Sequence, residues 1–332
     1  MIVVTGGTGF VGREICRGLA SEGLSVRALA RTPPKQPLPV GVEFFPGDVT
    51  QPDTLRMAFR GAKAVIHTVG IIQELGAQTF EQIHVQGTAH VIAAAQSAHV
   101  PRYLHLSALG TRPGAASRYH QTKWTAEELV RSSGLAHTIF RPSLIYGKGD
   151  AFTNQLASLM RPPLSWLSGG FVPIPGGEEV ILQPVAVGEV AEAVVRSLGQ
   201  MVALGNTFDL CGQPVSLKDL SLAIADCMGR KPTWVEQPPD VILGMIPWLW
   251  LKASKPVLFP VPLKLCRIAA AVVERILPHP PLTTDQVTML EEGQCGDAAP
   301  AENLFGFHPV ALREGLASYL APRAGGREDR RA

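Results

Sequence analysis

The sequence lacks the histidine and cysteine patterns that hold metal ions. Its nine histidines form no HExxH motif and its five cysteines form no CxxC pair, so we expect no protein-bound metal. An odd, unpatterned set of cysteines also suits a reducing cytoplasm better than a disulfide-bonded secreted protein. The cysteines are Cys16, Cys211, Cys227, Cys266 and Cys295.

Charge of either sign is also scarce. Charged residues make up 17% of the chain and the formal net charge is +2, so there is no basic footprint for a nucleic acid. With 46% hydrophobic residues the composition argues against disorder, and 332 residues suffice for one large domain or two. The opening run MIVVTGGTGF has no basic region or cleavage site, so we expect no signal peptide.

The chain opens with a strand-like run, a glycine-rich turn and a helix. Ile2–Thr5 is β-branched, as in a strand buried on both faces, and the helix is expected to end at Gly23. Between them, Gly6 permits a tight turn, Gly9 lets the backbone approach a pyrophosphate, and Gly12 lets the helix pack close to the strand. The amides of the helix N-terminus then face the phosphate. This arrangement predicts dinucleotide binding, and a glycine-rich turn without a ligand is the alternative.

The second strand-like run, SVRALAR, ends at Arg31. A dinucleotide-binding fold that prefers NAD usually places an acid here for the ribose 2′-hydroxyl. An arginine can instead pair with a 2′-phosphate, which favours NADP(H) over NAD(H) as the cofactor. The alternative is an ordinary surface arginine.

Strand-like and helix-like segments alternate through the first two thirds of the chain. This alternation predicts an α/β fold with a doubly wound parallel sheet. Ligands of such sheets lie at the carboxyl ends of the strands, where Asp48, Gly70, Ser107 and Pro142 fall. Strands are expected within 2–5, 25–31, 42–50, 62–70, 102–110, 135–147 and 206–212, and helices within 13–23, 51–61, 79–98, 117–128 and 190–199.

The stretch SRYHQTKWTAEE carries Tyr119 and Lys123 four residues apart. Residues with this spacing share one face of a helix, so the phenol and the ammonium can point the same way. A phenol titrates near pH 10 in water, and a nearby ammonium favours the phenolate, which brings the pKa closer to working pH.

Together these motifs resemble an extended or atypical short-chain dehydrogenase/reductase, a family with the Rossmann fold. The resemblance covers about residues 1–212 and rests on TGGTGFVG, GDV, LSALG, YHQTK, RPSLIYG and QPVAVGEVA. It implies that Tyr119 is the general acid or base at the substrate oxygen. It also implies that Lys123 holds the nicotinamide ribose and lowers the pKa of the phenol, and that Ser107 binds the same substrate oxygen. The expected cofactor-binding residues are Gly6, Thr8, Gly9, Phe10, Val11, Gly12, Arg31, Asp48, Val49, Gly70, Tyr119, Lys123, Pro142 and Ile145.

Three positions depart from the family pattern. His84 stands where relatives often have asparagine. Where relatives read QPVHV.DVA this chain reads QPVAVGEVA, with Ala186 and Gly188 as departures. We expect His84 to be a hydrogen-bonded structural residue rather than a replacement acid. A protein that binds the cofactor without turnover therefore remains an alternative to an enzyme.

The rest of the chain predicts a smaller, mostly helical domain on the substrate side. We expect a Rossmann domain over 1–212, the smaller domain over 213–320 and a disordered tail over 321–332. Residues 148–180, rich in proline and glycine, are predicted to be a long substrate-side loop. Trp166, Phe171 and Ile174 in this loop could line an apolar pocket, although ordinary packing is the alternative for each.

Residues 240–277 are unusually apolar, but the run 241–251 is too short to span a bilayer. We therefore expect no transmembrane helix. Trp248 and Trp250, beside Lys252 and Lys255, allow a peripheral contact of 241–265 with a membrane or a protein complex, and packing within the fold is the alternative. The segment PLTTDQVTMLEEGQ resembles the C-terminal region of the branch that includes the NADPH-binding accessory subunit of respiratory complex I and its free-standing bacterial relatives.

Two functions of different classes fit these observations. The first is an NADPH-dependent oxidoreductase that acts on a carbonyl or hydroxyl of an apolar small molecule. The second is a non-catalytic NADPH-binding protein that supports or senses a respiratory or membrane complex. A sugar-nucleotide epimerase fits less well, because the C-terminal region has few arginines for a diphosphate. We expect a cytoplasmic location, with peripheral contact at the inner face of the membrane as an extension.

Overall fold

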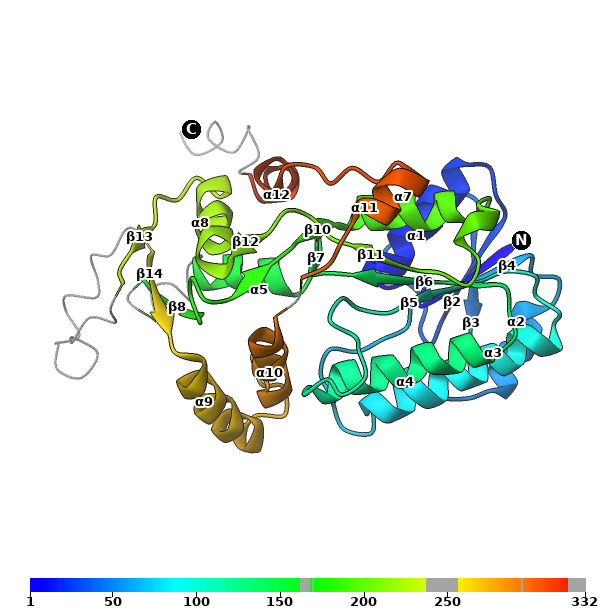
Figure 1. The fold of residues 1–332 in the computed structure, drawn as a ribbon, viewed down its shortest axis with the longest axis horizontal. Helices are drawn as coiled ribbons and strands as arrows, with labels where there is room; N and C mark the ends of the chain where they lie inside the picture. Colours follow the sequence, from blue (N-terminus) through cyan, green and yellow to red (C-terminus); the bar gives the residue numbers. More distant parts are fainter. Residues whose placement is uncertain (162–167, 169, 237–255, 294, 322–332) are drawn as a thin grey trace, which may run out of the picture.

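A seven-stranded, fully parallel sheet forms the larger part of the molecule (Figure 1). The computed structural model describes residues 1–161, 168, 170–236, 256–293 and 295–321. The strand order is β11-β6-β5-β4-β1-β2-β3, and it reverses direction at β1, as expected for a doubly wound sheet. The strands are β1 (Ile2–Thr5), β2 (Val26–Ala30), β3 (Val42–Pro46), β4 (Ala64–His67), β5 (Tyr103–Leu106), β6 (His137–Pro142) and β11 (Thr207–Leu210). The predicted fold class is confirmed.

Helices cover both faces of this sheet because its strands are apolar on both sides. Adjacent residues of one strand enter different cores: Val3 and Tyr103 pack on one face, and Val4 and Leu104 on the other. Figure 1 shows α1, α7 and α11 on one side and α2, α3 and α4 on the other. Their bounds are α1 (Phe10–Ser21), α2 (Asp53–Phe59), α3 (Gly87–Ser97), α4 (Arg118–Ser132), α7 (Val187–Ser197) and α11 (Ala299–Phe305).

The predicted single helix over residues 79–98 is wrong in one respect. Its first part, η1 (Glu81–Gln86), is a π-helix, and α3 follows it directly. A π-helical turn holds more residues than an α-helical one and is often found at functional sites. Ile83 and His84 are both buried within it. The hydrophobic spacing alone did not distinguish the two helix types.

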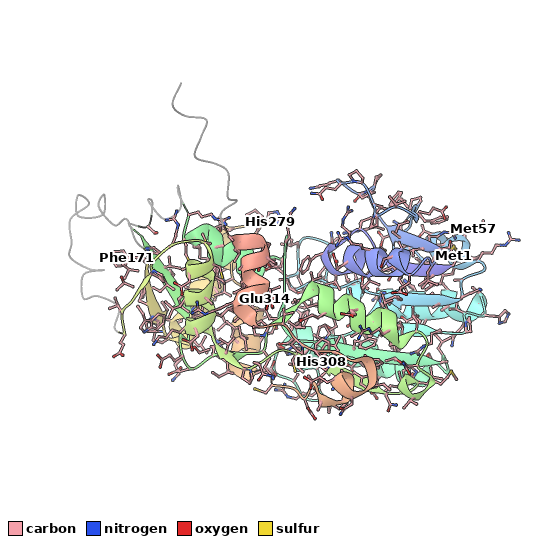
Figure 2. The ribbon with its side chains drawn as sticks, turned by 90° about the horizontal axis from the view of Figure 1, so that it is seen from above. Met1, Met57, Phe171, His279, His308 and Glu314 are labelled. Atoms are coloured by element: carbon pink, nitrogen blue, oxygen red, sulfur yellow. The ribbon has the colours of Figure 1, made fainter. Side chains whose placement is uncertain are left out.

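A second core lies at the opposite end of the molecule. Figure 2 shows Met57 of α2 and Phe171 of β8 at opposite ends of the long axis. This part contains a three-stranded parallel sheet of order β13-β14-β8 and two short pairs, β10-β7 and β12-β9. The elements are β7 (Ile145–Tyr146), α5 (Phe152–Leu159), β8 (Phe171–Pro175), β9 (Ile181–Leu182), β10 (Val185–Ala186), η2 (Met201–Ala203), β12 (Val215–Ser216), α8 (Leu217–Cys227), β13 (Thr233–Trp234), β14 (Val257–Val261), α9 (Leu263–Ile276), α10 (Thr284–Glu292) and α12 (Leu312–Leu320).

The predicted long loop over 148–180 is therefore wrong in part, because it contains α5 and β8. The strand was not predicted because it contains prolines at 173 and 175, which are rare within strands. These prolines are tolerated because β8 lies at the edge of its sheet. Ile174 is fully buried in the second core, so it packs there. Trp166 lies outside the described residues.

The apolar segment before β14 falls largely outside the part of the chain that the structure describes, including Trp248 and Trp250. Among the described residues, no helix has both the length and the apolar content to cross a bilayer. After α10 the chain returns to the large sheet, where α11 packs against β11 and α7.

Candidate active site

The glycine turn between β1 and α1 leaves no room for side chains. Gly6 has a φ of +75°, in the left-handed region that favours glycine. A Cβ on Gly12 would lie 2.2 Å from the carbonyl oxygen of Gly6, so only glycine permits this helix–strand contact. Gly9 is the N-cap of α1 and has no side-chain cap, which leaves the first amides of the helix without side-chain partners at this turn. This cradle fits a pyrophosphate.

Phe10, at the start of α1, lies close to the RPSLIYG segment, which contains further predicted cofactor-binding residues. The ring of Phe10 would lie 3.4 Å from a Cβ built on Gly147, which ends the RPSLIYG motif. Thr8 and Val11 are half-buried beside it. The motif that contains Pro142 and Ile145 is thereby brought next to the glycine turn.

Arg31 follows β2 directly and is exposed. Its guanidinium donates to the side-chain oxygen of Gln78 at 3.3 Å. A second guanidinium lies on the neighbouring loop, because Arg13 of α1 donates to the backbone oxygens of Gln36 (3.3 Å) and Pro37. Basic side chains therefore border the end of β2.

Asp48 and Val49 follow β3 in a tight turn. The Asp48 carboxylate accepts hydrogen bonds from the amide and the hydroxyl of Thr50, each at 2.8 Å. Val49 is buried against Gly87, and its carbonyl accepts from His90 at 2.8 Å. The Asp48 carboxylate therefore stabilises the turn that follows β3.

The ammonium of Lys123 lies beside Gly70. A Cβ on Gly70 would be 3.1 Å from Nζ of Lys123 and 3.6 Å from Nε2 of His84. The ammonium donates to the carbonyl oxygen of Leu106 at 3.1 Å. Burial lowers the pKa of Lys123 to about 8, while the nearby carboxylate of Glu127 opposes this shift.

His84 joins the segment after β4 to α4. Its Nε2 lies 3.1 Å from the amide nitrogen and 3.0 Å from the carbonyl oxygen of Ile71, and its Nδ1 lies 2.9 Å from the hydroxyl of Thr122. Burial, with a smaller contribution from the charge of Lys123, lowers the pKa of His84 to about 2, so the imidazole stays neutral. The contacts are those of a structural residue.

The Tyr119 ring is buried in an aromatic environment, edge-on to the rings of His84 (5.3 Å between centroids) and Phe80 (5.8 Å). Burial raises the pKa of Tyr119 to about 12. This shift is opposite in direction to the lowering expected from Lys123, because desolvation of the buried phenolate is its cause.

Ser107 forms a contact that the sequence analysis missed. Its hydroxyl donates to Oε1 of Glu127 at 2.5 Å and lies 3.5 Å from the hydroxyl of Thr111. Glu127 is fully buried, and it also accepts from Nε of Arg141 (2.8 Å) and from Arg131. Within the described residues no hydrogen bond joins Ser107 to Tyr119. The spacing in the sequence could have indicated this contact, because Glu127 lies four residues after Lys123 and therefore on the same face of the helix.

Two carboxylates of α10 hold the start of α4, and the sequence analysis also missed them. Asp285 accepts from the backbone amides of Arg118 (2.7 Å) and Tyr119 (3.1 Å). Glu292 accepts from the amide of Ser117 (3.3 Å) and from Nδ1 of His120 (3.1 Å). Free amides at a helix N-terminus favour negative partners, so α10 fixes the first turn of the helix that carries the candidate pair.

A polar pocket of about 390 Å³ opens beside this junction, at the carboxyl ends of β5, β6 and β11. It extends the candidate site away from the glycine turn. Its lining residues are Leu109, Gly110, Thr111, Arg112, Arg141, Asp209, Glu292, Gly293 and Cys295.

The doubly wound sheet and the glycine cradle are those of a dinucleotide-binding protein of the Rossmann class. Residues 6–158 match the family model described as NAD(P)H-binding. The chain therefore contains an NAD(P)-binding Rossmann domain, and its relatives confirm the resemblance to the short-chain dehydrogenases/reductases and to the complex I accessory subunit.

Two relatives represent these two groups. A ceramide reductase of Caulobacter vibrioides is 28% identical over 73% of this chain and 75% of that protein. The mitochondrial NADH dehydrogenase [ubiquinone] 1 alpha subcomplex subunit 9 of Arabidopsis thaliana is 28% identical over 73% of this chain and 61% of its own length. Among solved structures, MoeE5 in complex with UDP-glucuronic acid and NAD aligns with a TM-score of 0.68 at 19% identity over 96% of this chain and 97% of that one. At this identity the structural match supports the fold alone.

Proposed function

We propose that the protein is an NADPH-dependent oxidoreductase that transfers a hydride to or from a carbonyl or hydroxyl carbon of an apolar small molecule. The observation that carries this proposal is the placement of Tyr119 and Lys123 on one face of α4, with Lys123 against Gly70 and the carboxyl end of β5. The relative named ceramide reductase supports both the reaction class and an apolar substrate.

In this proposal the cofactor supplies the hydride chemistry, and the protein supplies position and charge. Gly6, Gly9 and Gly12 let the backbone approach the pyrophosphate. Lys123 donates to the nicotinamide ribose, and Tyr119 delivers a proton to the substrate oxygen or removes one from it.

The hydrogen bond from Ser107 to Glu127 restricts how Ser107 can bind the substrate oxygen. Because its proton points to Glu127, Ser107 has only acceptor capacity left in the present arrangement. It can accept from a substrate hydroxyl, but it must release Glu127 before it can donate to a carbonyl.

NADP(H) is the proposed cofactor because Arg31 and Arg13 border the end of β2, where a 2′-phosphate would lie. We also propose a cytoplasmic location with peripheral contact at the inner face of a membrane.

The second candidate function is a non-catalytic NADPH-binding accessory protein. The relation to the complex I subunit favours it, and so does the hydrogen bond in which the Ser107 hydroxyl donates to Glu127.

Tyr119→Phe and Lys123→Ala separate the two functions. NADPH oxidation would be followed with long-chain ketones of increasing length and with a ceramide precursor ketone, and NADPH affinity by calorimetry. For an enzyme, Tyr119→Phe should keep cofactor affinity and lower turnover by about 10²–10⁴-fold, while Lys123→Ala should lower both. For an accessory protein, wild type should oxidise NADPH with none of these ketones, Tyr119→Phe should change nothing, and Lys123→Ala should only weaken binding.

A further inference from the structure

Helix α9 exposes an apolar stripe. Cys266 and Ala270 on its inner side are buried with Val287 of α10. On its outer side the side chains at 265, 268, 272 and 276 repeat every three or four residues and therefore form one face. These residues are Leu265 (56% exposed), Ile268 (63%), Val272 (50%) and Ile276 (71%).

The charges that border this stripe are basic. Lys264 and Arg275 lie along one edge of it and are both exposed. The acid of the helix, Glu274, points to the inner side, where it accepts from the amide (2.8 Å) and the hydroxyl of Thr284. Arg267 is exposed and is paired with Glu291 of α10.

The position of α9 leaves this face open to a large partner. In Figure 1, α9 lies at the periphery, and α10 separates it from α4 and the seven-stranded sheet. The outer face is thus directed away from the candidate active site.

We propose that the outer face of α9 docks on the surface of a lipid bilayer that contains anionic lipids. An amphipathic helix with an apolar stripe and bordering lysine and arginine lies in the plane of the interface, with its stripe among the acyl chains and its cations at the headgroups. A second copy of the chain fits less well. Two α9 helices packed stripe to stripe and antiparallel would set the basic edges of both copies along one shared boundary, where α9 has no acid to neutralise them. This inference does not depend on turnover.

Vesicle co-sedimentation of the full chain tests the proposal. Vesicles of phosphatidylcholine with phosphatidylglycerol should bind the wild type at least tenfold better than pure phosphatidylcholine vesicles, because each cation near an anionic surface adds to the affinity. Ile268→Ser/Ile276→Ser should lower partitioning by about tenfold or more, since it removes two of the four inserted side chains. Lys264→Glu/Arg275→Glu should abolish the preference for the anionic vesicles.

The matched control is Met201→Ser/Val202→Ser, which removes two equally exposed apolar side chains from η2 (75% and 71%). It should bind as the wild type does. Circular dichroism and the melting temperature would establish that each variant is folded, as the exposure of all these side chains leads us to expect.

Three outcomes overturn the proposal. One is no binding of wild type to either kind of vesicle. Another is equal binding by Ile268→Ser/Ile276→Ser, which would assign any membrane contact to residues outside α9. A third is a wild-type dimer in sedimentation velocity that Ile268→Ser/Ile276→Ser dissociates, without vesicle binding, which would make a second copy the occupant.

Discussion

Replacing Glu292 by glutamine should uncouple α10 from the start of α4, with an effect that depends on pH. The Glu292 side chain is 5% exposed, and its two oxygens accept from Arg112 (2.9 Å), Ala116 (2.5 Å), Ser117 and His120. Burial alone would raise its pKa, but the hydrogen bonds from Ser117, His120 and the backbone lower the pKa from 4.5 to about 2. Glutamine keeps the shape but turns an NH₂ group towards these donors.

The size of the effect follows from this shift. One pKa unit corresponds to about 1.4 kcal/mol, so the lowering from 4.5 to about 2 sets an upper limit of roughly 3.5 kcal/mol, and we expect about 2 kcal/mol after solvent screening. A carboxyl with a lowered pKa stabilises the fold above its unfolded pKa and loses that contribution as the pH falls towards the folded value. The difference between wild type and Glu292→Gln should therefore be full at pH 7 and should shrink from about pH 4.5 downwards.

Urea unfolding at several pH values measures this difference. The control is Glu291→Gln, because Glu291 forms an exposed pair with Arg267 that should contribute less than about 1 kcal/mol. Hydrogen exchange of the amides of residues 116–120 should also accelerate in Glu292→Gln and not in the control. A pH-independent difference, or unchanged exchange at these amides, would refute the assignment of Glu292 as a carboxylate that holds the segment leading into α4.

Two further expectations concern the cofactor. Arg31→Ala should weaken NADP(H) about tenfold and leave NAD(H) unchanged by calorimetry; equal effects on the two cofactors would remove Arg31 from the 2′-phosphate site. Gly9→Val should abolish binding of both cofactors while circular dichroism still reports a folded protein, because the new side chain occupies the position of the pyrophosphate. Retained binding would mean that the glycine turn is structural only.

The sequence alone predicted those features of the fold and the site that depend on residues close together in the chain. The glycine spacing predicted the turn at Gly6, the β-branched run Ile2–Thr5 predicted the first strand, and the four-residue spacing predicted that Tyr119 and Lys123 share a face of α4. In each case one short segment contains all the residues that determine the result.

Contacts between distant segments were not predictable in this way. The hydroxyl of Ser107 binds Glu127, twenty residues away, and the carboxylate of Asp285 that accepts from the first amides of α4 comes from α10, more than 160 residues away. No spacing rule links such positions. The raised pKa of Tyr119 was missed for the same reason, because burial depends on packing by Phe80 and His84 from another helix.

The two pKa values of the candidate pair also favour one direction of reaction. At pH 7 the Tyr119 phenol, with a pKa of about 12, holds its proton, and Lys123, with a pKa of about 8, is mostly charged. A protonated phenol is ready to donate to the oxygen of a carbonyl that accepts hydride. Alcohol oxidation instead needs the phenolate, which a group of this pKa forms in roughly one molecule in 10⁵ at pH 7.

We therefore expect carbonyl reduction to be the faster direction at neutral pH, with a rate nearly constant from about pH 5 to 7, where both Tyr119 and Lys123 stay protonated. Alcohol oxidation should rise close to tenfold per pH unit over the same range, because each unit multiplies the phenolate fraction by ten. Initial rates in both directions, measured with one ketone and its alcohol, test this. If oxidation instead levels off near pH 7, bound NADP⁺ and Lys123 together lower the phenol's pKa by several units. The burial of Tyr119 would then no longer set the direction of the reaction.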